Sequence, residues 1–227
     1  MNQITTCDAS IRPYLRDFVA MQHAGDSLKV VEEFPLYGGD VRADMVAMNG
    51  SLHGYEIKSH KDNLDRLPRQ VEAYGAVFDR ASLVVPEPHL DSAKILIPDW
   101  WQILLIQCVG GGVCFKCLRR GRANPDREGF ALAALLWRPE ALMLLTTLGL
   151  EAGLKSAPMA KMMDRLVESV SVKKLAELVR QRLLARGDWL TASRQRRDGE
   201  TSQRPATHVR RRRTLYSRSS EYKRLPS

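Results

Sequence analysis

The sequence contains no apolar run long enough to cross a membrane, and it has few cysteines. Its longest apolar runs are WWQILLIQCV and FALAALLW, well below the ~20 residues that a membrane-spanning helix needs. The four cysteines occur without an apolar leader at the N-terminus, which argues against a secreted, disulfide-bonded protein. We therefore expect a soluble, cytoplasmic protein that does not contact a membrane.

Most of the chain also lacks an excess of charge of either sign. The formal net charge is +9, but residues 191–227 contain 11 Lys and Arg against 3 Asp and Glu, which leaves 24 against 23 for residues 1–190. Residues 190–227 have almost no apolar side chains, so they cannot bury enough surface to offset the entropy lost on ordering. We expect a disordered Arg-rich tail there. It either contacts nucleic-acid phosphates without sequence preference or is a solvated or read-through extension.

The spacing of apolar residues predicts an α/β order in the first half of the chain. Residues 8–24 are expected to form a helix, followed by a meander of three short strands within residues 28–59 and a second helix over about residues 62–80. The segments SLVVP and KILIP indicate two further strands. WWQILLIQCV, GGG and VCFKCLRR together indicate a hairpin with a glycine turn.

After residue 124 the pattern becomes entirely helical. The segments GFALAALLW, PEALMLLTTLG, AKMMDRLVESV and SVKKLAELVRQRLLAR all have helical spacing, and Pro139 and Ser171 are start signals. We therefore predict three parts, which are an α/β domain of residues 1–124, a helical C-terminal unit of residues 125–189 and the tail of residues 190–227. The apolar segments of the helical unit either pack on the first domain or recruit a protein partner.

Three charged residues interrupt two of the predicted strands. In RADMV, Asp44 shares a strand face with Arg42 and Val46, and in GYEIKS, Glu56 and Lys58 share one face. A hairpin-length gap joins these strands, so Asp44, Glu56 and Lys58 can converge at one spot. Their convergence is the main functional signal of the sequence.

Two carboxylates that are forced together in a half-buried site favour a divalent cation. Repulsion and burial both raise the pKa of a carboxyl group, and a cation relieves both costs. Oxygen ligands of this kind suit Mg²⁺ or Mn²⁺, which share their remaining positions with water and substrate phosphates. A neighbouring ammonium can then orient a water and offset charge in the transition state. The residue types of this group therefore predict phosphodiester hydrolysis.

These residues resemble a known signature. Asp44 followed by Glu56 and Lys58 matches the D-x(n)-(D/E)-x-K pattern of the PD-(D/E)XK nuclease superfamily, and QVEAY supplies Gln70 and Tyr74 at the Q-x-x-x-Y spacing of its RecB-like branch. No proline precedes Asp44, which departs from the usual first motif and leaves the metal role in place.

A longer stretch resembles a narrower family. The segment RADMVAMNGSLHGYEIKSHKDNLDRLPRQVEAYGAVFDRASLVV, with PDWW, NPD and ALLWRPEALMLL, looks like an uncharacterised family of bacterial and phage proteins known by a myxobacterial locus tag. This resemblance covers roughly residues 11–189. It therefore includes the helical unit as well as the predicted site.

The superfamily resemblance implies a restriction-endonuclease-like mixed β-sheet flanked by helices, and Mg²⁺- or Mn²⁺-dependent cleavage of DNA. It also implies roles for individual residues. The metal ligands would be Asp44, Glu56, the Ile57 carbonyl and the additional acid Glu33; Lys58 would assist the attacking water; Gln70 and Tyr74 would support the site or touch the substrate backbone. Independently of the resemblance, Arg66 and Arg69 flank the start of the second helix and can hold phosphates.

Each of these interpretations has a simpler alternative. Asp44, Glu56 and Lys58 form an ordinary cross-strand salt bridge if their face is solvated, worth only ~0.2–1 kcal/mol. Tyr74 falls on the apolar stripe of its helix and serves packing equally well. For the whole protein, the alternative is a module that binds nucleic acid or a protein partner in a phage, defence or repair pathway. DNA or RNA, endo- or exonuclease action, one or two metals and the oligomeric state stay open.

Overall fold

The computed structural model describes residues 8–23 and 27–187, and these ranges hold a mixed α/β fold. The expected disordered tail of residues 190–227 lies outside the described residues. Among the helices of the described ranges, none combines the length and the apolar character needed to cross a bilayer. The described residues up to Arg186 form one compact unit. The predicted division at residue 124 stays a prediction.

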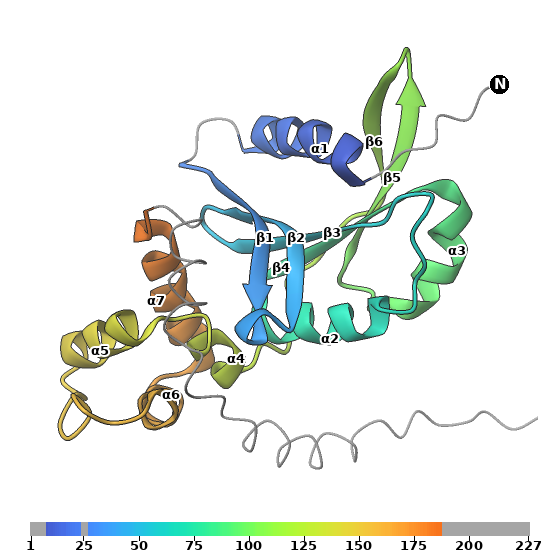
Figure 1. Ribbon diagram of the computed structural model, residues 1–227. Coiled ribbons are helices and arrows are strands. Elements are labelled where there is room, and N and C mark those ends of the chain that lie inside the picture. The colour runs from blue at the N-terminus through green and yellow to red at the C-terminus, as the bar shows by residue number, and fades with distance from the viewer. Residues whose placement is uncertain (1–7, 24–26, 188–227) are drawn as a thin grey trace, which may run out of the picture. The chain divides into compact units, whose positions relative to one another are not determined.

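One six-stranded mixed sheet forms the centre of the fold (Figure 1). Its strands follow one another in chain order. The first three pair antiparallel as the predicted meander, β3, β4 and β5 run parallel, and β5 and β6 form the predicted hairpin. The strands are β1 (Lys29–Leu36), β2 (Val41–Met48), β3 (Leu52–Ile57), β4 (Arg80–Val85), β5 (Gln102–Val109) and β6 (Gly112–Arg119), with a short 3-10 turn η1 (Tyr37–Gly39) between β1 and β2.

Helices cover both faces of this sheet, as Figure 1 shows. On one face lies α1 (Asp8–Gln22), whose Ile11, Leu15 and Val19 are fully buried against the strands. On the other lies α2 (Leu67–Val77), the crossover from β3 to β4. The helical spacing of apolar residues in both segments is therefore explained by packing on the sheet.

One predicted strand is wrong. Residues of KILIP belong mostly to α3 (Glu87–Leu96), and the next strand begins only at Gln102. A short apolar run does not by itself distinguish a strand from a helix. Here Pro86 precedes the helix, Ala93 faces the core and Ile95 points to solvent. The helix completes the connection between the parallel strands β4 and β5, which requires a crossover.

The predicted helical segments after residue 124 form four helices. They are α4 (Gly129–Ala133), α5 (Arg138–Thr147), α6 (Met159–Ser169) and α7 (Val172–Ala185). Pro139 lies in the first turn of α5, and the Ser171 hydroxyl caps α7 by accepting the Lys174 N–H. Both start signals are therefore confirmed.

Asn124, which precedes the first of these helices, binds the C-terminal end of α2. Its side-chain amide donates hydrogen bonds to the carbonyls of Gly75 (2.6 Å) and Phe78 (2.8 Å), at the C-terminal end of α2. Its backbone N–H donates to the Asp79 carbonyl. These bonds satisfy carbonyls that the end of a helix leaves without partners. Asn124 therefore fixes the helix that carries Gln70 and Tyr74.

Candidate functional site

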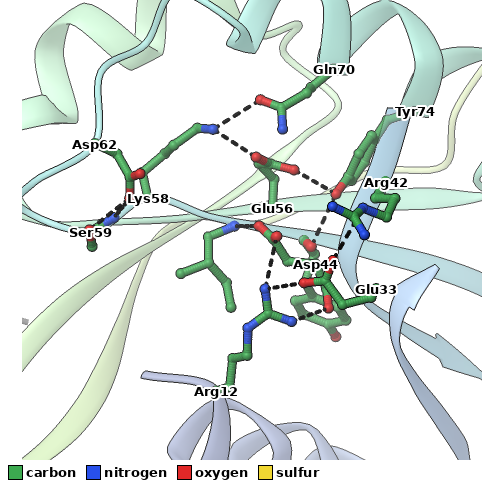
Figure 2. Close-up of polar contacts among 12 residues, drawn as sticks. Arg12, Glu33, Arg42, Asp44, Glu56, Lys58, Ser59, Asp62, Gln70 and Tyr74 are labelled. Atoms are coloured by element: carbon green, nitrogen blue, oxygen red, sulfur yellow. Dashed lines mark hydrogen bonds and ion pairs between the residues drawn. The ribbon is translucent and has the colours of Figure 1, made fainter. Parts of the chain in front are cut away.

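The predicted charged residues lie where β2 and β3 separate. Pairing of these strands ends at Met45 opposite Tyr55, and beyond it the Asp44 carboxylate bridges the gap by accepting the Ile57 N–H at 2.7 Å. Because successive side chains of β3 point to opposite faces of the sheet, Tyr55 and Ile57 lie in the core beneath α1 and Glu56 faces α2. The alternation predicted for β3 is therefore confirmed at Glu56, whereas the Asp44 side chain contacts Arg12 of α1 and the Ile57 N–H (Figure 2).

Glu56 and Lys58 form a buried ion pair. The Lys58 ammonium donates to Glu56 Oε1 at 2.7 Å. Lys58 is 4% exposed and Glu56 is 1% exposed. The same ammonium donates to the side-chain oxygen Oε1 of Gln70 at 2.9 Å. The Tyr74 hydroxyl donates to Glu56 Oε2 at 2.8 Å. Gln70 and Tyr74, one turn apart on α2, therefore hold the pair from the other side (Figure 2).

The environment shifts the pKa values of this group. Burial raises the pKa of Glu56, while the charge and hydrogen bond of Lys58 oppose that shift. Burial also raises the pKa of Tyr74, and the charges of Glu56 and Asp44 raise it further. Both carboxylates therefore act on the same phenol.

A second ion-pair group surrounds Asp44. Arg12 of α1 donates to Asp44 Oδ1 at 3.1 Å, to the Asp44 carbonyl at 2.9 Å and to Glu33 Oε1 at 2.7 Å. Arg42 approaches the other Glu33 oxygen at 3.3 Å. The predicted acid Glu33 therefore shares a guanidinium with Asp44, and Figure 2 shows Arg12 reaching both from the helix below them.

The backbone of Glu33 is strained. Its φ of 53° lies in the left-handed region although it stands within β1, a conformation that costs a residue with a Cβ of order 1–3 kcal/mol. The register places it opposite Asp44, between the pairs of Glu32 with Met45 and Phe34 with Ala43. Strain of this kind concentrates at functional sites. It therefore supports a role for Glu33 beyond that of a surface acid.

The loop after Lys58 is fixed by a local turn. The Asp62 carboxylate accepts both the Ser59 N–H (2.6 Å) and the Ser59 hydroxyl (2.7 Å). Burial works against its ionisation, but these hydrogen bonds and the charges of Lys58 and Arg66 together lower the pKa of Asp62. The ionised carboxylate therefore stabilises the segment that carries Lys58 toward α2.

The two predicted phosphate-binding arginines lie outside this cluster. Arg66 occupies the N-cap position of α2 without a capping hydrogen bond from its side chain, Arg69 lies in the first turn, and both are exposed. Their exposure leaves them accessible to a ligand. Contact with phosphates stays a prediction.

The described residues contain no group of three or more His, Cys, Asp or Glu side chains arranged to hold a metal ion. The available oxygen donors are the carboxylates of Asp44, Glu33 and Glu56. The Ile57 N–H is used to orient Asp44. A metal at this site would therefore depend on water or substrate for its remaining ligands.

Arg12 and Arg42 are site residues that the sequence did not predict. A signal for Arg12 exists, because Arg12 and Arg16 are one helical turn apart and the acids Glu32 and Glu33 are adjacent. Arg16 pairs with Glu32 just as Arg12 pairs with Glu33. To pair these arginines with these acids, one must know that α1 lies across β1. The residue spacing alone does not provide this information.

Comparisons with known proteins agree on one family. The family model described as "Bacteriophage P4 protein cII" matches residues 8–197. Protein cII of Enterobacteria phage P4 is 26% identical over 121 residues, which are 53% of this chain and 46% of that protein. The chain thus spans about half the length of this curated relative. No solved structure matches the chain, and neither description states an activity. The family match covers well over half of the chain, which therefore belongs to the bacteriophage P4 protein cII family.

Proposed function

We propose that this chain is a Mg²⁺- or Mn²⁺-dependent nuclease of the PD-(D/E)XK type that hydrolyses DNA phosphodiester bonds. The observation that carries the proposal is the buried Lys58–Glu56 pair, which flanks Ile57, the residue whose N–H binds the Asp44 carboxylate. Burying an ion pair costs more solvation than a surface salt bridge and adds little stability. A cluster of this kind, with perturbed pKa values and several convergent polar groups, is a candidate for chemistry.

The arrangement of elements supports a restriction-endonuclease-like fold. An initial helix precedes an antiparallel meander that carries the acids, and α2 with Gln70 and Tyr74 follows directly. The mixed sheet is flanked by helices on both faces (Figure 1). This is the order that the resemblance to the superfamily implies.

The oxygen donors of the cluster fit a hard divalent cation. Asp44 and Glu33 already hold the Arg12 guanidinium between their oxygens, so this carboxylate pair can bind a positive charge. The residues that would hold the metal are Asp44, Glu56, the Ile57 carbonyl and Glu33. When bound, Mg²⁺ would supply Lewis-acid stabilisation of the negative charge that develops on the phosphoryl oxygens.

The chain's own residues would perform the remaining functions. Lys58 would orient the attacking water and offset developing charge, and its ammonium is held in position by Glu56 and Gln70. Tyr74 would fix the Glu56 carboxylate. Arg66 and Arg69, exposed at the start of α2, would contact substrate phosphates.

An alternative function is a module that binds nucleic acid or a protein partner. One observation favours it: Asp44 already has Arg12 as its cation, and Glu56 already has Lys58. An acid cluster neutralised within the chain does not need a metal to fold. The membership of a phage family supports a phage context for either function.

The test is a cleavage assay on linear, nicked, single-stranded and branched DNA and on RNA, with Mg²⁺, Mn²⁺ or EDTA. We expect metal-dependent cutting of DNA by the wild type that is lost in Asp44→Ala, Glu56→Ala and Lys58→Ala. The matched control is the exposed neighbour Lys61→Ala, which should cut normally. Equal cutting by wild type and the three variants would refute the assigned site, and binding without cutting would favour the module.

A further inference from the structure

The Arg12 guanidinium occupies the space between two predicted metal ligands. It contacts Asp44 Oδ1 at 3.1 Å and Glu33 Oε1 at 2.7 Å, both through its Nη2 atom, while Nη1 donates to the Asp44 carbonyl. The Arg12 side chain is 14% exposed and that of Asp44 is 21% exposed. These are therefore partly desolvated contacts, in which salt and water screen the charges less than on the surface.

A second cation cannot join this pair while the guanidinium stays in place. Nη2 lies within hydrogen-bond distance of both carboxylates at once, so a metal that used the same two oxygens would meet it at close range. Two like charges a few ångströms apart in a partly buried site repel each other strongly. Metal and guanidinium therefore exclude each other at this position.

We propose that Arg12 is the resident cation of the Asp44–Glu33 pair, and that a divalent metal binds there by displacing it. This inference rests on the proposed metal role of these acids. It assigns Arg12 as a positioning residue: it holds two like-charged carboxylates together before the metal arrives, and its departure is coupled to metal binding. The affinity measured for the metal therefore includes the free energy of breaking the Arg12 contacts.

Displacement leaves the rest of the site in place. The backbone of α1 is held by Ile11 and Leu15, which are fully buried in the core, so only the long Arg12 side chain needs to move. The second Asp44 oxygen is fixed by the Ile57 N–H. The second Glu33 oxygen has Arg42, whose side chain is largely exposed. Both acids thus keep a partner after the guanidinium has left.

The chain contains a matched control for Arg12. Arg16 lies one turn further along α1 and pairs with Glu32, which precedes Glu33. Its side chain is 57% exposed, and it does not contact Asp44 in the structure. Replacing Arg16 therefore removes the same charge from the same helix without removing the proposed competitor.

The experiment measures Mn²⁺ binding by electron paramagnetic resonance in the wild type, Arg12→Gln, Arg12→Lys, Arg16→Gln and Arg12→Gln/Asp44→Asn. We expect Arg12→Gln to bind Mn²⁺ roughly tenfold or more tightly than the wild type, because a like charge is removed. Arg12→Lys should stay close to the wild type, as should Arg16→Gln. The double variant should lose the gain. Thermal melting of each variant verifies that it is folded.

A second measurement follows the guanidinium directly. The Arg12 Nε–Hε NMR signal, assigned by its absence in Arg12→Lys, should shift when Mg²⁺ is added, while the Arg16 signal should not. Equal or weaker Mn²⁺ binding by Arg12→Gln, or an unmoved Arg12 signal while the metal binds, would overturn the inference. Failure of every form to bind metal would overturn it too. If Arg12→Gln gains affinity but no form cuts DNA, the inference holds and the nuclease proposal fails.

Discussion

Tyr74 donates a hydrogen bond of 2.8 Å to Glu56, and this contact joins helix α2 to the buried acid of strand β3. The same hydroxyl reaches the Tyr55 carbonyl at 3.1 Å. The ring packs against Phe78 and Trp101. Tyr74 therefore combines core packing with a hydrogen bond to the predicted site residue Glu56, and its part in a functional site stays a prediction.

Tyr74→Phe should separate these two roles. The ring contacts remain, but Glu56 and the Tyr55 carbonyl lose a buried donor, which costs about 1–3 kcal/mol of folding free energy. Urea unfolding measures this loss. Tyr14→Phe, at an exposed tyrosine, is the control and should change stability by less than about 0.5 kcal/mol. Equal losses in the two variants would show that the Tyr74 hydroxyl contributes nothing specific.

Lys58→Met should destabilise the fold strongly, by about 3–5 kcal/mol, because it leaves the buried Glu56 carboxylate without its cation. Glu56→Gln/Lys58→Met removes both charges and should lose less than Lys58→Met alone. A double-mutant cycle from urea unfolding measures the coupling. Additive losses would mean that the two side chains are not energetically paired.

Gly54→Ala should disturb the contact between β3 and α2. A Cβ at Gly54 would lie 2.5 Å from the Phe78 ring and 3.0 Å from the Tyr74 ring, so the rings must shift at a cost of about 1–3 kcal/mol. Gly75→Ala, where nothing lies within 4 Å, should leave the protein as stable or up to about 1 kcal/mol more stable, since alanine favours helix. Thermal unfolding compares them, and equal behaviour would contradict this packing.

His53 should make stability fall in mild acid. Burial first, and then the charges of Arg80 and His23, lower the pKa of His53 to about 3. The unfolded chain takes up this proton near pH 6.5, so between about pH 6.5 and 3 the unfolded state binds more protons. Stability should therefore fall as pH falls through this window, by up to about 1.4 kcal/mol per pH unit.

Urea midpoints of the wild type and His53→Gln between pH 7 and pH 5 measure this effect. The variant should show a shallower dependence on pH than the wild type. The Ser82 hydroxyl, 2.8 Å from His53 Nε2, can hydrogen-bond to glutamine as well, which limits the cost of the replacement. Identical slopes would show that another group controls acid stability in this range.

Alternation and helical spacing were sufficient to predict the strands of the meander and the orientation of Glu56 toward α2. Both patterns report local geometry, which the chain keeps wherever it packs. The KILIP prediction was wrong because a short apolar run satisfies both periods. Only the need for a crossover between two parallel strands, a property of the whole sheet, decides in favour of a helix.

The Arg12 contacts could not be predicted by the same means. Arg12 and Asp44 are 32 residues apart, and their contact depends on how α1 crosses the sheet. The left-handed backbone of Glu33 was equally hidden, because nothing in the residue type demands it. Long-range ion pairs and local strain follow from tertiary packing, and they are the features that sequence patterns record least well.

Asn124 also sets an order of events during synthesis. It lies 49 residues after Gly75, whose carbonyl it binds, so the ribosome has already released strands β1 to β6 before the C-terminal end of α2 can be closed. A nascent chain that has not yet exposed Asn124 carries all the acids and the lysine, but the Gly75 and Phe78 carbonyls at the end of its Tyr74 helix lack this donor. The bonds that close the end of α2 can therefore form only after Asn124 has emerged, immediately before the helical part.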